Sequence, residues 1–387
     1  MEAHVLGKVT RRLIPYLFIL YVVAFLDRVN LGYAALKMNA DLSLSDAVFG
    51  LAAGIFFIGY FIFEVPSNLL LHRLGARVWI ARILVSWGII AMLTAFVQNA
   101  GQLYLARFLL GVAEAGFFPG VILYLTYWLP MREQARAVAL FMTAVAVSNL
   151  IGAPLSTWIL DHVHALGLSG WRWLFILEGL PAVILGVATL YVLADRPQQA
   201  KWLTEEEKAW LEQELARDHQ SSRMASLREG LAAPKVWYFA LLYFLAVMGL
   251  YGTGFWLPTI IKGMLESYVA KPTNTQVGLL LVIPYAAAVI AMVYWGRRSD
   301  RLGERRLHTA LALALAGVGM FLAGLLFQNG ILSFLAIVLS VMGIYGVFGP
   351  FWSFVNLFLT GTAAAAGQRV LGWSTRSAIW RDLLAPM

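Results

Sequence analysis

The chain has 387 residues, of which 60% are hydrophobic and only 13% are charged, and its mean hydropathy is +0.74. Soluble globular proteins carry about 45–50% apolar and about 25% charged residues, so this composition excludes an ordinary soluble domain and a disordered chain. The absence of cysteine excludes a disulfide scaffold. The composition predicts a protein that crosses a membrane several times.

Ten apolar segments are each long enough to cross a hydrocarbon layer about 30 Å thick as a helix. Their runs are continuous rather than alternating, which excludes the strands of a β-barrel. The first segment contains Asp27, Arg28 and Asn30 and no small-residue cleavage pattern, so we predict a retained span rather than a signal peptide. The predicted spans are 13–35, 47–71, 78–97, 103–127, 136–159, 172–194, 236–261, 276–296, 307–327 and 331–359.

Basic residues lie mainly on one side of the predicted membrane. With the N-terminus inside, the inner segments carry 22 Lys and Arg and the outer loops carry 3. The positive-inside rule then places the N-terminus in the cytoplasm. This orientation signal explains the net charge of +8, so we predict no binding of nucleic acid.

One long polar interval, residues 195–235, divides the spans into six and four. In this interval Thr204 and Glu207 form a capping box, which predicts a short, solvated surface helix through Leu215 with no chemistry of its own. The predicted domains are an N-terminal six-helix bundle over 1–195, a cytoplasmic linker with this short helix over 196–235, and a C-terminal bundle of four helices plus a non-spanning tail over 236–387.

A short loop is repeated in the two parts. Residues 72–77 read His-Arg-Leu-Gly-Ala-Arg, and residues 300–305, 228 positions later, read Asp-Arg-Leu-Gly-Glu-Arg. Both copies follow the second span of their half and lie on the predicted inner side. Parallel repeats of this kind are an architecture of secondary transporters, whose substrate site lies near the membrane midplane between the halves.

These motifs resemble known families. The second loop copy with its preceding residues, 296–305, resembles the signature loop of the major facilitator superfamily, Gly-x-x-x-Asp-Arg-x-Gly-x-Arg. The first copy departs from it, because Asn68 and His72 replace the Gly and the Asp. The stretches 25–30, 63–68 and 107–120 resemble the anion:cation symporter family, and most closely its tartrate-transporter-like members.

The resemblance, from about residue 8 to Gly367, implies an all-α, multi-spanning major facilitator fold of two helical bundles related by a pseudo-repeat. It implies proton-coupled import of small organic anions, such as tartrate or sugar acids, across the bacterial inner membrane by alternating access. The proton gradient would supply the energy without a cofactor, and we expect a monomer. The resemblance also implies that the two repeated loops form a cytoplasmic gate. The residues of these gate loops are Arg73, Gly75, Arg77, Gly296, Asp300, Arg301, Gly303 and Arg305. The alternative is that their charged members only set the orientation of the chain in the membrane.

The end of the chain departs from the family, in which twelve spans are usual. After Gly367 the sequence has three Arg in about twenty residues, and each Arg costs about 2.5 to 3.5 kcal/mol at a helix centre. We therefore expect a tail that does not span, left by a frameshift or truncation. A transport-inactive carrier product is one alternative for the function.

A charge inside a membrane costs at least about 2.5–3.5 kcal/mol and indicates function, and four of the charged residues inside the predicted spans stand out. Asp27 and Arg28 are in the first span, and Arg107 and Glu114 are in the fourth. The latter two are seven residues apart, which puts them on one helix face but about 10.5 Å apart along the axis. That distance predicts that Arg107 and Glu114 act as two separate charged sites and do not form a direct salt bridge.

The chemistry of these groups suggests a division of roles. Arginine is always charged and offers paired hydrogen bonds to a carboxylate, so Arg28 and Arg107 are predicted to bind the substrate anion. Desolvation favours the protonated carboxyl and a nearby Arg favours the ionised one, so Asp27 and Glu114 are predicted to carry the proton. The resemblance implies the same roles. Two alternatives remain: Asp27 and Arg28 neutralise each other, or Arg107 snorkels to the interface.

Other residues are weaker candidates. Substrate contacts or core packing are both open for Tyr60, Trp352, Ser353 and Asn356. For Glu64 and Glu178 we favour structural pairing.

Other classes of function find little support. His162 and His164 lack companion ligands, so no metal site is predicted. There is no phosphate-binding loop for ATP-driven transport, and no nucleophile–base pair for an enzyme. The remaining alternative within the carrier class is an exporter of anionic drugs or metabolites.

Overall fold

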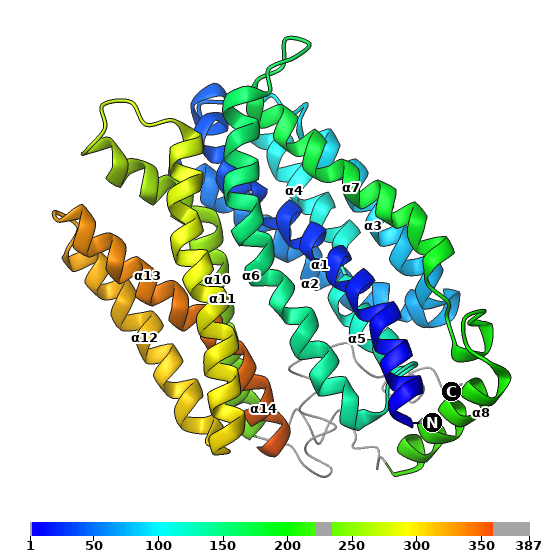
Figure 1. The fold of residues 1–387 in the computed structure, drawn as a ribbon. Helices are drawn as coiled ribbons and strands as arrows, with labels where there is room; N and C mark the ends of the chain where they lie inside the picture. Colours follow the sequence, from blue (N-terminus) through cyan, green and yellow to red (C-terminus); the bar gives the residue numbers. More distant parts are fainter. Residues whose placement is uncertain (1, 222–233, 359–387) are drawn as a thin grey trace.

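The computed structural model describes residues 2–221 and 234–358, and every regular element in these residues is a helix (Figure 1). Ten helices or helix pairs are long and apolar enough to span a membrane. The predicted all-α fold with ten spans is therefore confirmed. The predicted tail lies outside the described residues.

The helices form two groups (Figure 1). The first group contains α1 (Glu2–Asp41), α2 (Asp46–Leu74), α3 (Ala76–Thr94), α4 (Ala100–Glu114), α5 (Phe117–Thr126), α6 (Met131–His162) and α7 (Gly170–Val192). A short 3-10 helix, η1 (Pro197–Gln199), and the helix α8 (Glu205–Ser221) follow. The second group contains α10 (Pro234–Glu266), α11 (Asn274–Leu302), α12 (Arg305–Leu325), α13 (Gly330–Gly346) and α14 (Phe348–Phe358). Below, the two groups are called the N-half and the C-half.

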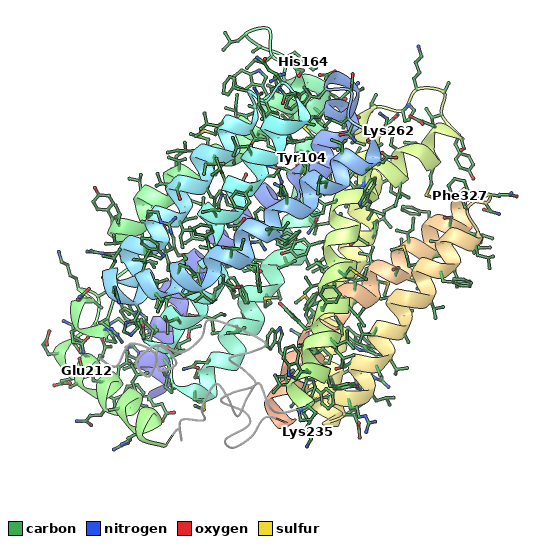
Figure 2. The ribbon with its side chains drawn as sticks, turned by 180° about the vertical axis from the view of Figure 1, so that it is seen from behind. Tyr104, His164, Glu212, Lys235, Lys262 and Phe327 are labelled. Carbon is green, nitrogen blue, oxygen red and sulfur yellow. The ribbon has the colours of Figure 1, made fainter. Side chains whose placement is uncertain are left out.

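The residues labelled in Figure 2 mark the two ends of the molecule. Glu212 of α8 and Lys235 lie at one end, whereas His164, Lys262 and Phe327 lie at the other. The first end also carries the N-terminus and both repeated loops (Figure 1). We call it the basic face and the other end the opposite face.

Four of the helices that begin at the opposite face, α2, α4, α11 and α13, have side-chain caps, whereas Ser169 at the start of α7 makes no such hydrogen bond. Ser45, Asn99 and Asn329 each accept a hydrogen bond from the backbone of the first turn of α2, α4 and α13. Thr273 forms a complete capping box with Gln276 at the start of α11. A side-chain oxygen at this position satisfies a backbone N–H that has no partner inside the helix, which fixes where each span begins.

The fourth and tenth spans are each interrupted, which the prediction of single helices over 103–127 and 331–359 missed. In the N-half the break follows Glu114, and Gly116 has the left-handed φ of 84° that glycine tolerates best. Both breaks are followed by a proline, Pro119 in α5 and Pro350 in α14, and each is the third residue of its helix. Proline fits a first turn because the N–H that it lacks would have no partner inside the helix there. The two halves therefore resemble each other in their broken fourth spans as well as in the repeated loops.

Close helix crossing explains two of the glycines. A Cβ on Gly111 of α4 would lie 2.1 Å from the backbone oxygen of Phe56 in α2, and one on Gly59 would lie 2.5 Å from that of Phe108. The backbones of α2 and α4 are therefore in contact. Gly54 of α2, by contrast, has no atom within 4 Å of such a Cβ.

We expect Gly111→Ala to destabilise the protein and Gly54→Ala to leave its stability nearly unchanged. Overpacking a tight contact costs about 1–3 kcal/mol, whereas open space accepts a methyl group. Thermal unfolding of the two variants in the same detergent measures the difference. Equal melting temperatures would contradict the backbone contact between α2 and α4.

The linker helix α8 is attached to the N-half. Its predicted capping box is confirmed, because Thr204 N donates to Glu207 at 2.9 Å and Glu207 N donates to Thr204 Oγ1 at 3.2 Å. Lys8 of α1 also donates to Glu207 at 2.8 Å, and this hydrogen bond lowers the pKa of the Glu207 carboxyl. Leu211 is fully buried. The predicted surface helix is therefore present, but it continues to Ser221 and buries Glu207 and Leu211 instead of being solvated on every side.

Candidate functional site

The four charged side chains singled out in the predicted spans are all buried. The exposed fraction is 2% for Asp27, 5% for Arg28, 0% for Arg107 and 1% for Glu114. They come from α1, which is buried continuously from Ala24 to Leu36, and from the end of α4. None of the four points outward to the lipid.

Asp27 and Arg28 have different partners although they are adjacent in sequence. Arg28 forms an ion pair with Glu114 and donates to the hydroxyl of Tyr251 in α10 at 2.5 Å. Asp27 accepts a hydrogen bond at 2.7 Å from Trp87 of α3. Neighbouring residues on a helix point about 100° apart, which explains the separation. In the described residues the two charges do not form an ion pair, so mutual neutralisation is not what holds them there.

Arg107 is fully buried and its guanidinium has no hydrogen-bond partner in the described residues. The guanidinium carbon lies 5.0 Å from the ring centroid of Phe56 and 6.0 Å from that of Phe255 in α10. Full burial contradicts the snorkelling alternative. A buried donor group without an acceptor is costly, so the Arg107 guanidinium has unused capacity to donate hydrogen bonds to oxygen atoms.

Aromatic rings surround the Arg28 guanidinium carbon. The ring centroids of Tyr60, Phe56 and Tyr251 lie 5.3, 5.4 and 5.8 Å from it. The sequence prediction included Tyr60 but missed Tyr251, which comes from the C-half. The signal it could have used is the spacing of Tyr251 and Phe255, which puts both rings on one face of α10.

The C-half candidates lie apart from these charges. Trp352 of α14 packs on Tyr243 of α10 with ring centroids 5.3 Å apart, and its indole N–H has no partner in the described residues. Ser353 is partly buried. The side chain of Asn356 lies outside the described residues. No described contact links Trp352 or Ser353 to Arg28, Arg107 or Glu114.

A second polar cluster lies inside the N-half. Glu178 of α7 is buried and accepts a hydrogen bond at 2.6 Å from Ser156 of α6. Its second oxygen, both amide atoms of Asn30 and one oxygen of Asp27 have no hydrogen-bond partner among the described residues. The structural pairing favoured for Glu178 is this hydrogen bond with Ser156, and neither Glu178 nor Glu64 forms an ion pair among the described residues.

The two halves are joined from mid-depth to the opposite face. Asp161 at the end of α6 accepts three hydrogen bonds from the start of α11: from Asn274 Nδ2 at 2.6 Å, Thr275 N at 2.7 Å and Thr275 Oγ1 at 2.8 Å. Lys262 of α10 donates to the Leu36 carbonyl of α1 at 3.2 Å. The carboxylate of Asp161 also faces the positive end of the α11 dipole. These contacts link the two halves at the opposite face.

We expect Asp161→Ala to open the opposite face. Losing even one charge-assisted hydrogen bond of about 1.5 kcal/mol shifts a two-state equilibrium about tenfold. The chain has no cysteine, so an Ile261→Cys reporter, buried in α10, can be labelled with a membrane-impermeant maleimide. Asp41→Ala is the control, because Asp41 bonds Trp171 within the N-half at 2.7 Å. Equal labelling in both variants would contradict the role of Asp161.

Each predicted gate loop turns at a glycine, but the two backbone conformations differ, with ψ of 147° at Gly75 and −1° at Gly303. Gly75 and Gly303 both have positive φ, 92° and 69°. In the second copy Asp300 pairs with Arg305 at 3.1 Å. In the first copy, where His72 replaces the aspartate, Asp195 after α7 accepts from the Arg77 backbone N–H at 2.8 Å. The side chains of Arg73 and Arg301 are exposed, and a Cβ added to Gly296 would have no atom within 4 Å.

Two parallel helical bundles with corresponding loops and broken spans, joined over buried charges, define a membrane transport protein. Residues 17–377 match the profile described as Major Facilitator Superfamily, and the chain belongs to this family. A relative from Agrobacterium vitis named "Putative tartrate transporter" is 48% identical, with 95% of this chain and 81% of the relative covered. A quinolone resistance transporter of Acinetobacter baumannii is 42% identical, with 95% and 84% covered.

A solved structure shows the same fold. It is the partially occluded inward open conformation of the xylose transporter XylE from E. coli, with a TM-score of 0.69 at 17% identity, covering 93% of this chain and 89% of that one. The family comprises transporters and not enzymes. The described residues contain no group of three or more His, Cys, Asp or Glu that could hold a metal ion.

Proposed function

We propose that the chain is a proton-coupled symporter that imports small organic anions, in the class of tartrate and sugar acids, by alternating access. The observation that carries the proposal is the buried Arg107 guanidinium, which has no acceptor in the described residues. The relatives from Agrobacterium vitis, named for tartrate transport, support an anion of this class.

Two arginines suit an anion with two oxygen-bearing ends. The guanidinium carbons of Arg28 and Arg107 lie 5.4 and 5.0 Å from the ring centroid of Phe56, so both can reach one small molecule next to that ring. Each guanidinium can bind a carboxylate through two parallel hydrogen bonds. Phe255 of the C-half lies over Arg107, so the site forms where the two halves meet.

In this proposal Glu114 and the substrate carboxylate compete for Arg28, and this competition couples transport to protons. In the structure Glu114 holds Arg28 in an ion pair. Protonation of Glu114 would release Arg28 to bind the substrate carboxylate, and the return of the ion pair would expel both the anion and the proton. Asp27 is the second proton site in this proposal, since Trp87 and not an arginine holds its carboxyl group.

The orientation follows from the charges. The basic face is cytoplasmic by the positive-inside rule, so the N-terminus lies on the cytoplasmic side of the bacterial inner membrane. The opposite face, where the two halves are linked, then faces outward, and the anion leaves toward the basic face. The transporter acts as a monomer and uses the proton gradient without a cofactor.

An exporter of anionic drugs is the second candidate, because a relative at 42% identity is named a quinolone resistance transporter. The two arginines would serve a drug carboxylate equally well. The direction of proton-driven movement separates the candidates, since an importer moves the anion with the proton and a proton-driven exporter moves it against the proton.

Proteoliposomes test the proposal. The purified chain is reconstituted with a pH dye in the lumen, and radiolabelled L-tartrate, D-galactonate and D-glucarate are added with an inward proton gradient. We expect accumulation of at least one anion together with acidification of the lumen. Accumulation without acidification would refute proton symport, and the absence of accumulation of all three would refute the substrate class.

A further inference from the structure

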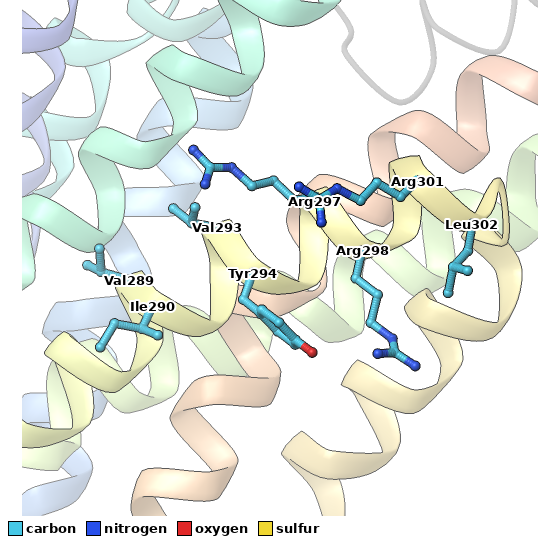
Figure 3. A pocket seen from close by; sticks show the side chains of 8 residues that line it. All are labelled: Val289, Ile290, Val293, Tyr294, Arg297, Arg298, Arg301 and Leu302. Carbon is cyan, nitrogen blue, oxygen red and sulfur yellow. The ribbon is translucent and has the colours of Figure 1, made fainter.

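A hollow on the surface of α11 has no role in the proposed transport site. It has a volume of about 660 Å³ and lies on the half of the helix next to the basic face (Figure 3). The residues that line it are Val289, Ile290, Val293, Tyr294, Arg297, Arg298, Arg301 and Leu302.

The lining residues form two neighbouring stripes at a spacing of four. Residues 289, 293, 297 and 301 form one stripe, and residues 290, 294, 298 and 302 form the other. Residues four apart lie one above the other on a helix. Figure 3 shows Arg297 and Arg301 leaving the helix on one side and Tyr294 and Arg298 on the neighbouring side. The hollow is thus apolar toward mid-membrane and strongly basic toward the basic face.

The apolar part of the hollow faces outward. Ile290 is 69% exposed and Tyr294 is 58% exposed in a helix long and apolar enough to span a membrane. Such a surface meets lipid chains. Arg297, Arg298 and Arg301 follow Tyr294 within two helical turns, where the helix is expected to reach the lipid headgroups.

The arginines lack an acidic partner in the part of the chain that the structure describes. The nearest carboxylate in sequence, Asp300, pairs with Arg305 at 3.1 Å instead. Three guanidinium groups within five residues therefore present uncompensated charge to a membrane surface. Arginine binds phosphate oxygens in a fixed fork geometry, and basic pockets between helices on the cytoplasmic side hold anionic lipid headgroups.

We propose that this hollow binds one anionic phospholipid of the leaflet at the basic face. The phosphate lies against Arg297, Arg298 and Arg301, and an acyl chain lies along Ile290 and Tyr294. The order of apolar and basic residues along α11 matches the order of chain and headgroup in the bilayer. A free phosphate would use only the basic half of the hollow, so the lipid fits the whole surface better. The inference does not depend on the transported substrate.

The experiment must separate this hollow from general attraction, because every exposed Lys or Arg near a membrane attracts anionic lipid by about 1 kcal/mol. The test variant is R297Q/R298Q/R301Q. The matched control is R11Q/R12Q/K201Q, which removes three exposed charges elsewhere on the basic face. I290Q tests the apolar half. Each purified protein is incubated with mixed micelles of dioleoylphosphatidylglycerol in dioleoylphosphatidylcholine at 0.15 M salt, and retained phosphatidylglycerol is counted by native mass spectrometry.

We expect saturable binding of phosphatidylglycerol to the unmodified chain, an affinity loss of at least tenfold in R297Q/R298Q/R301Q, and less than twofold loss in the control. I290Q should lose several-fold. Equal loss in both triple variants would overturn the proposal in favour of general charge attraction. If I290Q binds phosphatidylglycerol as well as the unmodified chain does, and inorganic phosphate displaces the lipid completely, the hollow is a phosphate site and the proposal is overturned. The single variant R298Q, with an expected several-fold loss, serves if the triple variant does not fold.

Discussion

Replacement of Arg107 by glutamine is expected to reduce anion uptake at least about 100-fold. The guanidinium is fully buried and has no hydrogen-bond acceptor in the described residues, so a carboxylate that reaches it gains two charge-assisted hydrogen bonds. Each such bond contributes about 1.5–3 kcal/mol, and two together exceed a factor of 100. Uptake of the anion that the unmodified chain accumulates in proteoliposomes is the measurement. Arg107→Lys keeps the positive charge but loses the planar guanidinium that binds a carboxylate through two hydrogen bonds, so its uptake should lie between those of the unmodified chain and Arg107→Gln.

The same variant should be at least as stable as the unmodified protein. Removing a buried charge that has no partner removes a desolvation penalty and breaks no hydrogen bond among the described residues. A melting temperature that stays level or rises while uptake is lost would distinguish a binding residue from a structural one. Arg82→Gln is the control, because its guanidinium stacks on Trp79 at 3.9 Å within the N-half. Normal uptake by Arg107→Gln would remove Arg107 from the site.

The sequence predicts the spans and the buried charges well because both follow from the cost of polar groups in hydrocarbon. The ten spans and the intramembrane positions of Arg28, Arg107 and Glu114 needed only composition and spacing. The interruption after Glu114 also had a local signal, the glycine and proline at 116 and 119, but a window that averages hydropathy does not detect a break inside an apolar run.

Partners from different helices could not be predicted in the same way. The sequence leaves open whether Arg28 pairs with its neighbour Asp27, and only the rotation of α1 between α3 and α4 sends Asp27 to Trp87 and Arg28 to Glu114. The contacts of Asp161 with the start of α11 join residues 113 and 114 positions apart, and no local pattern marks such a pair.

Glu114→Gln is expected to abolish proton-driven accumulation while anion exchange across the membrane persists. Glutamine cannot ionise, so it no longer competes with the substrate for Arg28, and Arg28 stays available to the anion throughout the cycle. Net uptake with an inward proton gradient should therefore lose its acidification of the lumen. Exchange of internal for external labelled anion, which needs no net proton movement, should continue at a rate within about tenfold of the unmodified chain.

Glu178→Gln is the matched control, because Glu178 is also a buried carboxyl group but bonds Ser156 rather than an arginine. If the ion pair carries the coupling, Glu178→Gln keeps acidification and Glu114→Gln loses it. Breaking a buried ion pair costs about 3–5 kcal/mol, so Glu114→Gln should also melt earlier, and the double variant Arg28→Gln/Glu114→Gln should recover part of that stability. Full acidification by Glu114→Gln would contradict competition for Arg28 as the coupling mechanism, whereas loss only in Glu178→Gln would move the proton site to the cluster between α6 and α7.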